Sequence, residues 1–588
     1  MYNSMMRIKF ILFILLVLLA ACAHAPMQEA AEDDPDQHVM DMSVVLPGMS
    51  DEEAERFYPK VELSEKMLFT FLLADIAQQR GRTELAAKTF MDLAKKTRDA
   101  RVARRAAQLS FEARDMDQAV DALKLWQELE PQAAMPKQML ATVLVTGGKL
   151  EEARPYLQEM LAANSKDAGH IFEKIYPTFA RHKDKLAAYD MLRELAQPYL
   201  SFAEVHWILA QAAEAAAKHD VALAEARKAR SIRPEWEWPV LLEAQILLVN
   251  NPAEAIAVEK KFLSSYPESN DVRLSYARIL LEKKEYKESR SQFQLLQKKQ
   301  PENAEIAFAI ALLSIQMGEL DRAEQELKQT LEVGKKDSAT VHYYLAQLNE
   351  AKKQDEVAFR EYQQVKDGEL VFQARMRMAY LLVKANKLSE AREILRQTES
   401  KNEQEQAVLI LTEGQILRDA KQYDQAYKVL TQGLVKLPGQ PELLYEAAMV
   451  ADKQGRLDTV EENLRKLIKV APAHAHAYNA LGYALLERKV RLHEAMQLLE
   501  KAYQLAPDDA AIMDSMGWGY YLTGNMDKSV EFMRRAYAAL PDPEVAAHLG
   551  EVLWEQGKHE EAKNTWQENL KLNPGSPALK AVIKKFLP

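Results

Sequence analysis

Histidine and carboxylate side chains are the groups in this chain that could bind metal ions or transfer protons. His474 and His476 stand in PAHAHAY, two residues apart at the expected start of a helix, with no third ligand close by in the sequence. A capping or surface role is therefore the favoured interpretation, and no metal site is predicted. Adjacent carboxylates such as Glu560 and Glu561 fall in an exposed turn, where they keep the surface solvated.

Motifs of common enzyme classes are missing from the sequence. It has no GxxxxGK[ST] phosphate loop, no GxGxxG after a strand, no HExxH and no GxSxG. No pair of carboxylates has the isolation and spacing that a glycoside hydrolase needs. The sequence therefore predicts no enzyme, no cofactor and no small-molecule substrate. An enzyme would require carboxylates of separate segments to converge in the folded chain.

The overall charge argues against nucleic acid as a partner. The formal net charge is -10 and the isoelectric point is near 5.8, whereas non-specific phosphate binding needs a basic face. The densest basic stretch is interpreted as a solvated face rather than a site for an acidic partner. It comprises Lys95, Lys96, Arg98, Arg101, Arg104 and Arg105.

The N-terminus has the pattern of an export signal. Arg7 and Lys9 precede an apolar run of 12 residues from Phe10 to Ala21, which is shorter than the roughly 20 residues that span a bilayer. Leu19-Ala20-Ala21-Cys22 resembles the bacterial lipobox, and Cys22 is the only cysteine. The resemblance implies a signal peptide over 1–21, cleavage before Cys22, and acyl chains such as palmitate on that residue. The alternative is an ordinary cleaved signal with a chance cysteine.

Residues 22–62 are expected to form a tether. They are acidic (Glu32, Asp33, Asp34, Asp36) and broken by Pro26, Pro35, Pro47 and Pro59. A flexible acidic segment of this kind would hold a folded body clear of a membrane. Val44, Val45 and Leu46 could instead dock on that body. By resemblance to sorted lipoproteins, Ala23 after the cysteine favours the outer membrane, with the protein facing the periplasm.

Beyond the tether, the sequence repeats itself with a period close to 34. A small residue recurs at intervals of 33 to 35, as expected where two antiparallel helices approach closely. These repeat marks are Ala86, Ala119, Ala153, Ala187, Ala222, Ala255, Ser289, Ala323, Ala358, Ala391, Ala426, Val460, Ala495, Ser529 and Ala562.

Proline and glycine punctuate the same period. Proline ends many units twelve residues after the mark, and glycine often lies five residues before it, where it makes the turn between helices. This pattern resembles the tetratricopeptide repeat, a helix-turn-helix unit of 34 residues. The resemblance implies an all-α, right-handed superhelical solenoid of about fifteen units over 63–575, followed by a capping helix over 576–588.

Two repeats depart from the pattern, and one junction between repeats carries a pair of tryptophans. Repeat four has His182 in place of the turn glycine and Pro177 in its first helix, so a kink or a shortened helix is expected there. One extra residue between Gly482 and Ala495 is assigned to a turn. Trp236 and Trp238, in PEWEWP, either staple two units together or mark an exposed contact, and the structural role is favoured.

In the tetratricopeptide family, the fifth and ninth residues of each first helix line a concave groove. Carried over by phase, the predicted partner-binding residues are Phe71, Trp207, Phe308, Tyr343, Tyr380, Tyr445, Tyr483, Asp514 and Trp518, with Tyr521 and Trp554 extending the same face. Aromatic rings make good anchors for a bound chain. Packing of the same rings as core between first helices is an equally open interpretation.

Family members that grip C-terminal carboxylates use Lys, Asn and Arg at these phases. Here the corresponding pairs are Asn479 with Tyr483, Asp514 with Trp518, and Ala547 with Glu551, so a carboxylate clamp is not supported. An extended or helical peptide with apolar side chains fits better.

A looser resemblance links the chain to large tetratricopeptide lipoproteins of Gram-negative outer membranes. It is carried by the three C-terminal units and the closing GSPALKAVIKKFLP. It implies a lipid-anchored, non-catalytic scaffold that binds protein partners in outer-membrane assembly or biogenesis. The alternative is a periplasmic subunit of a polysaccharide-export apparatus.

Overall fold

A computed structural model describes residues 59, 61–334 and 338–587. Within these ranges the chain has 31 α-helices, two short 3-10 helices and no strand. The predicted signal peptide, Cys22 and the predicted tether up to Tyr58 lie outside the described residues. The chain divides into two compact units, 1–326 and 327–588, with the boundary inside helix α18 (Leu320–Val333).

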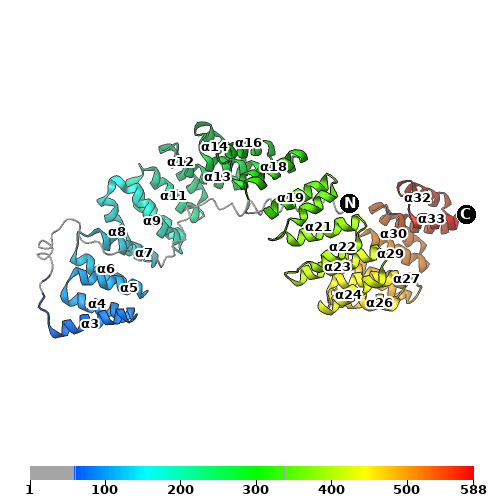
Figure 1. Cartoon of the computed structure of the whole chain (residues 1–588), viewed down its shortest axis with the longest axis horizontal. Coiled ribbons are helices and arrows are strands. Elements are labelled where there is room, and N and C mark those ends of the chain that lie inside the picture. Colours follow the sequence, from blue (N-terminus) through cyan, green and yellow to red (C-terminus); the bar gives the residue numbers. More distant parts are fainter. Residues whose placement is uncertain (1–58, 60, 335–337, 588) are drawn as a thin grey trace. The chain divides into compact units, whose positions relative to one another are not determined.

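The helices of the first unit follow one another in chain order (Figure 1). They are α3 (Glu65–Gln79), α4 (Thr83–Thr97), α5 (Ala100–Glu112), α6 (Met116–Leu129), α7 (Ala134–Thr146), α8 (Leu150–Ala163), α9 (Ala168–Arg181), α10 (Lys185–Ala196), α11 (Ala203–Ala215), α12 (His219–Ile232), α13 (Glu237–Asn250), α14 (Pro252–Ser265), α15 (Asn270–Glu282), α16 (Tyr286–Lys299) and α17 (Ala304–Gln316). The 3-10 helices η1 (Ser165–Asp167) and η2 (Gln197–Tyr199) lie on either side of the fourth pair.

The second unit continues in the same manner. Its helices are α19 (Ser338–Ala351), α20 (Asp355–Gln363), α21 (Val371–Lys384), α22 (Leu388–Gln397), α23 (Glu403–Asp419), α24 (Tyr423–Lys436), α25 (Pro441–Lys453), α26 (Leu457–Val470), α27 (Ala475–Glu487), α28 (Leu492–Leu505), α29 (Ala510–Leu522), α30 (Met526–Ala539), α31 (Pro543–Glu555), α32 (His559–Leu572) and α33 (Pro577–Phe586). The described helices thus form fifteen pairs and one closing helix.

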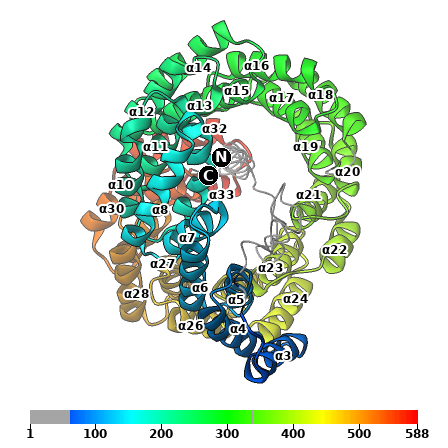
Figure 2. The same ribbon diagram turned by 90° about the vertical axis from the view of Figure 1, so that its left-hand side faces the viewer.

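Each pair contributes one helix to each of two layers. In the second unit, α19, α21 and α23 form the inner layer, while α20, α22 and α24 lie outside them (Figure 2). First helices of successive pairs contact one another, as α27 does with α29 and α29 with α31. The expected all-α solenoid of helix pairs is confirmed, and the handedness of its superhelix stays a prediction.

The repeat marks lie where the two helices of a pair meet. All of them except Ala187 are fully buried, with 0% of their surface exposed. In repeat four, Ala187 is only half-buried and the next residue, Ala188, is 4% exposed. The predicted mark was therefore wrong by one residue in this repeat, because the shift keeps the buried side chain on the face of α10 that packs inward.

A second small position, on the first helix, faces the residue four places after the mark. A Cβ built on each of four glycines would lie within 3.0 Å of that residue, closer than real Cβ atoms approach. The pairs are Gly414 with Leu430, Gly482 with Leu499, Gly517 with Met533, and Gly550 with Trp566. These glycines are required by packing, because a side chain at any of them would enter its neighbour.

In twelve of the fifteen pairs, the turn between the helices uses a residue of positive φ five places before the mark. The predicted turn glycines adopt this left-handed conformation, as Gly524 does with φ of +84°. Repeat thirteen has four residues between α27 and α28 where repeat fourteen has three between α29 and α30, so the extra residue does lie in the turn. Pro177 lies inside α9, which continues to Arg181, so α9 is not shortened at the proline.

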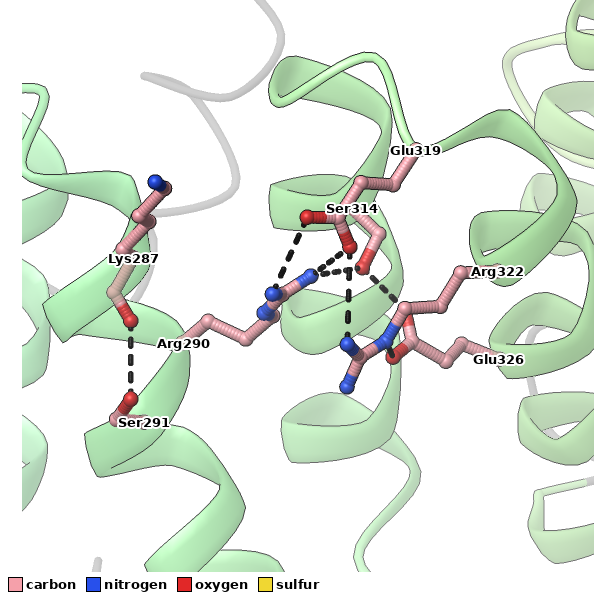
Figure 3. A network of polar contacts seen from close by, with 7 residues as sticks. All are labelled: Lys287, Arg290, Ser291, Ser314, Glu319, Arg322 and Glu326. Atoms are coloured by element: carbon pink, nitrogen blue, oxygen red, sulfur yellow. Dashed lines mark hydrogen bonds and ion pairs between the residues drawn. The ribbon is translucent and has the colours of Figure 1, made fainter.

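Ion pairs join successive helix pairs, a feature that the repeat pattern did not predict. Arg290 on α16 bonds Glu319 in the turn before α18, and its Nη1 lies 3.2 Å from Ser314 Oγ on α17 (Figure 3). Ser314 also donates to Glu326, which Arg322 bonds at 2.9 Å. The backbone carbonyl of Lys287 accepts a hydrogen bond from Ser291 Oγ within α16. Such contacts fix the orientation of successive helix pairs in addition to the apolar packing between them.

None of the helices in the described part of the chain is both long and apolar enough to cross a membrane.

Candidate partner-binding surface

Five of the predicted aromatic residues lie on the first helices of the last four pairs. They are half-buried, so each ring packs on one side and leaves part of its area exposed. This aromatic surface consists of Tyr445 on α25, Tyr483 on α27, Trp518 and Tyr521 on α29, and Trp554 on α31. Each of these side chains therefore contributes to packing and keeps part of its area accessible, and its role in binding a partner stays a prediction.

The centre of the aromatic surface is built from three residues of two neighbouring helices. His548 Nδ1 on α31 lies 2.9 Å from Asp514 Oδ2 on α29, and the His548 ring stacks on Trp518 with centroids 4.6 Å apart. Tyr521 packs beside Trp518 at 5.1 Å. The sequence had indicated Asp514 and Trp518 but not His548. His548 follows Asp514 by 34 residues, one repeat period, so comparison of equivalent positions could have found it.

The charge state of His548 is set by its carboxylate neighbours. Burial alone lowers the pKa of His548, but the hydrogen bond to Asp514 and the negative charges of Asp514, Glu544 and Glu551 outweigh it, and the pKa is raised above 6.5. A histidine whose pKa is raised by folding stabilises the fold below its unfolded-state pKa. That contribution is lost as the pH rises through the folded-state pKa.

Replacing Asp514 with asparagine is expected to lower the pKa of His548 and to weaken the pH dependence of local stability at the α29–α31 contact. The physical reason is that the amide removes the negative charge but keeps the shape. Titration of the His548 ring by NMR measures the shift directly. Asp508→Asn, at an exposed position before α29, is the matched control and should leave the titration unchanged. An unchanged pKa in Asp514→Asn would contradict the pairing.

The groups around Tyr483 give this surface an acidic character. Burial raises the pKa of Tyr483, and the negative charges of Glu487, Asp514, Glu544 and Asp452 raise it further. Two buried oxygens here, Asn479 Oδ1 and Asp514 Oδ1, have no hydrogen-bonding partner among the described residues. Half-exposed rings next to carboxylates and unused acceptors can bind a chain that brings apolar side chains and a cation.

Trp554 has a different environment from the other rings. It stacks on His559 at 4.3 Å and on Trp566 at 5.9 Å, and Phe586 of α33 lies 5.8 Å away. Trp566 itself is fully buried. Trp554 therefore helps to hold the closing helix α33 on the last pair, and its part in binding a partner stays a prediction.

The remaining predicted residues of the second unit are spread between core and surface. Tyr343 is 5% exposed and packs against Tyr344 and Tyr362, so it belongs to the core and offers a partner little area. Tyr380 is 46% exposed, with Arg377 over its ring at 4.8 Å. Tyr445 packs on His474, which caps the start of α27 by accepting from Ala477 N, so the favoured capping role of His474 is confirmed.

The other three predicted partner-binding residues lie in the first unit. Phe71 on α3 is 45% exposed and meets Phe90 edge to face, while Phe308 on α17 is half-buried. Trp207 on α11 packs against Trp236 at 5.8 Å, across the junction with α13. Trp236 thus joins two helix pairs, in agreement with the favoured structural role. Within the described residues, no group of three histidine, cysteine or carboxylate side chains could hold a metal ion.

Comparisons with known proteins agree with this architecture. A tetratricopeptide-repeat family model matches residues 249–304, 308–369 and 445–510. A TPR repeat-containing protein of Pseudomonas aeruginosa, PA4667, is 31% identical over 489 residues, which cover 83% of this chain and 82% of the relative. The human protein O-mannosyl-transferase TMTC1 is 23% identical over 181 residues, 29% of this chain and 20% of that protein.

Among solved structures, a thermophilic TPR protein of Thermus thermophilus, TTC0263, is 26% identical. The match covers 31% of this chain and 98% of that one, with a TM-score of 0.29. The long alignment with the Pseudomonas protein, together with the fifteen helix pairs and their buried small residues, assigns the family. The chain belongs to the tetratricopeptide repeat proteins, whose repeats serve as scaffolds for protein–protein interaction.

Proposed function

We propose that the protein is a non-catalytic scaffold of the cell envelope that captures a partner protein on the aromatic surface of its last four helix pairs. The observation that carries this proposal is the Asp514–His548–Trp518 arrangement with half-exposed Tyr483 and Tyr521 beside it. Rigid rings contribute contact area at a low cost in conformational entropy, which is why they dominate the energetics of protein interfaces.

The partner expected here is an extended or helical segment with apolar side chains and at least one lysine or arginine. Glu487 and Glu544 supply negative charge around Tyr483, while Asp452 is paired with Arg488, and a cation placed over an aromatic ring adds about 0.5–2 kcal/mol. A C-terminal carboxylate would meet Asp514 at the centre of the surface and be repelled.

Location follows from the N-terminus in this proposal. Acylated Cys22 would anchor the protein in the outer membrane, facing the periplasm, and the acidic tether would set its reach. The partner would then act in outer-membrane assembly or biogenesis. A role in polysaccharide export is the alternative, and a pull-down that returned a secretion channel or sugar-modifying enzymes would favour it.

The test is an in-cell crosslink and pull-down from membranes with the Tyr483→Ala, Trp518→Ala double variant. Loss of these two aromatic side chains is expected to weaken the affinity for the partner by about 30-fold or more, since single hot-spot residues contribute 2 kcal/mol or more. Tyr503→Ala serves as the matched control, because Tyr503 is a half-buried aromatic on the second helix α28, outside the aromatic surface.

Circular dichroism of both variants must match the unmodified protein for the comparison to count. If recovery of the partner falls with the double variant but not with Tyr503→Ala, the result supports the proposed surface. A partner that persists with both would reject the surface as the binding site, while leaving the helix-pair architecture untouched.

A further inference from the structure

Helix α3, the first described helix, has an apolar face that no described element covers. It packs on α4 through small residues such as Ala74 and Ala77, which are buried. The opposite side carries large apolar side chains with 39% to 66% of their area exposed, namely Leu68, Phe69, Leu72, Leu73 and Ile76, and Leu63, just before the helix, is 69% exposed. A solenoid normally covers its terminal repeat or gives it a polar outer face, and α3 has neither among the residues that the structure describes.

Helices α4 and α5, which follow α3 in the chain and lie beside it, are strongly basic. Residues 80–114 contain ten Lys or Arg and four Asp or Glu, a formal charge of +6 in a chain whose total is -10. Lys95 and Lys96 at the end of α4 are exposed. Arg105 on α5 donates to Gln78 of α3 at 2.7 Å, so this basic region adjoins α3 itself.

The sequence immediately before α3 has the opposite charge. Residues 23–58 contain ten Asp or Glu and one arginine, a formal charge of -9. Within them stands a short apolar group, Val44, Val45 and Leu46, with acidic residues on both sides. The chain therefore contains a segment whose apolar centre and acidic flanks match the apolar face and basic neighbours of α3.

We propose that Val44, Val45 and Leu46 pack on the exposed face of α3 of the same chain, with the flanking acidic residues held by the basic side chains of α4 and α5. The segment would act as the N-terminal cap of the solenoid. It would also shorten the tether, because only residues 23–43 would remain between the cap and Cys22. This inference does not depend on the aromatic surface or on its partner.

Chain length favours this occupant over a second molecule. Fourteen residues lie between Leu46 and Val61, and a coil of that length has a root-mean-square end-to-end distance of about 21 Å. Helix α3, with 15 residues, is about 22 Å long. A linker whose mean length matches the span gives its segment an effective concentration in the millimolar range, well above that of a second copy in solution.

The test uses the full chain with Cys22→Ser, which leaves no other thiol, and two pairs of introduced cysteines. Val45→Cys with Leu72→Cys probes the proposed contact. Val45→Cys with Val249→Cys is the matched control, since Val249 on α13 is apolar and 81% exposed. A short bis-maleimide is expected to join the first pair within one chain at least tenfold more efficiently than the control, with a yield independent of protein concentration.

Three other outcomes would overturn the proposal. Equal yields from both pairs would mean that residues 44–46 have no preferred position. Crosslinking between chains by Leu72→Cys alone, rising with concentration, would assign the face to a second copy. Protection of Leu72→Cys from maleimide only when vesicles of phosphatidylethanolamine and phosphatidylglycerol are added would assign it to a lipid surface.

A second variant tests the charge component. Lys95→Glu with Lys96→Glu is expected to lower the intrachain yield several-fold, because two favourable charges become repulsive to the acidic flanks. Lys260→Glu with Lys261→Glu, an exposed pair on α14, is the control and should leave the yield unchanged. An equal yield in both variants would contradict the electrostatic contribution.

Discussion

Replacing Gly550 with alanine is expected to destabilise the last helix pair by about 2–4 kcal/mol, because the added methyl group has no space. A Cβ at Gly550 would lie 2.0 Å from Trp566 Nε1 and 2.4 Å from Cε2. Trp566 is fully buried and donates a hydrogen bond to the carbonyl of Ala547 at 3.3 Å. Moving this indole would lose that bond and disturb its stacking on Trp554 and Phe586.

Hydrogen exchange is the appropriate measurement, because repeat arrays unfold locally and a single unfolding midpoint does not describe them. Protection should fall in α31 to α33 and stay unchanged in distant pairs. Gly575→Ala is the control, since Gly575 has no atom within 4 Å of the added Cβ. Combining Gly550→Ala with Trp566→Leu should restore part of the protection, because the twelfth pair has Ala448 and Leu464 at the same two positions. Full protection in Gly550→Ala alone would contradict the close approach.

Replacing Glu259 with leucine is expected to stabilise the sixth helix pair, most strongly at alkaline pH. Glu259 on α14 is 0% exposed, and neither carboxylate oxygen has a hydrogen-bonding partner among the described residues. It stands four residues after the mark Ala255, a position that other repeats fill with apolar side chains such as Phe293, Leu327 and Trp566. Leucine would restore that pattern without leaving a buried carboxylate.

The pH dependence has a definite sign. Burial raises the pKa of Glu259 from an ordinary value of 4.5 to about 8, and the nearby hydroxyl of Ser275, which favours the charged form, offsets only part of this effect. Between these values the folded state keeps a proton that the unfolded state has lost, so stability falls as the pH rises from 4.5 to about 8. The accumulated loss is on the order of 3–5 kcal/mol above pH 8. Its neighbour Tyr276 on α15, whose pKa is also raised by burial and by Glu288, Glu285 and Glu259, does not titrate in this window.

Urea unfolding at pH 5 and pH 8, followed locally by hydrogen exchange in α13 to α15, measures the effect. Glu259→Gln removes the charge with little change of volume, and Glu259→Leu adds apolar burial, so both should flatten the pH dependence. Glu282→Gln is the matched control, because Glu282 lies on the neighbouring helix α15 and is exposed. A pH dependence that survives in both Glu259 variants would show that another group causes it.

The number and order of the helix pairs could be predicted from the sequence because the constraints that define a repeat are local. A small residue recurs where two helices cross, glycine allows the left-handed turn, and proline ends the second helix. Each requirement falls within one period, so fifteen marks predicted fifteen pairs. Of the fifteen marks, only Ala187 was wrong. The turn of repeat four has neither a glycine nor, unlike most other pairs, a residue of positive φ, so the phase cannot be read there to one residue.

The candidate site could be predicted only in part. Periodicity indicated which residues lie on the first helices, and it found Asp514, Trp518 and Tyr483. It could not separate the half-exposed rings from Tyr343, which is buried, because exposure depends on how far each side chain is covered by the next pair. It also did not predict that His548 bonds Asp514, since that contact joins two repeats.

The sequence by itself therefore determined the class of fold, the fifteen units and the faces on which side chains lie, because helix periodicity and turn chemistry act over a few residues. Only the tertiary structure decided which of those side chains are exposed, how Asp514, Trp518 and His548 combine, and that Glu259 is fully buried. The physical reason is that burial, ion pairing and pKa depend on residues brought together from neighbouring repeats, and their distances are set by packing rather than by position in the chain.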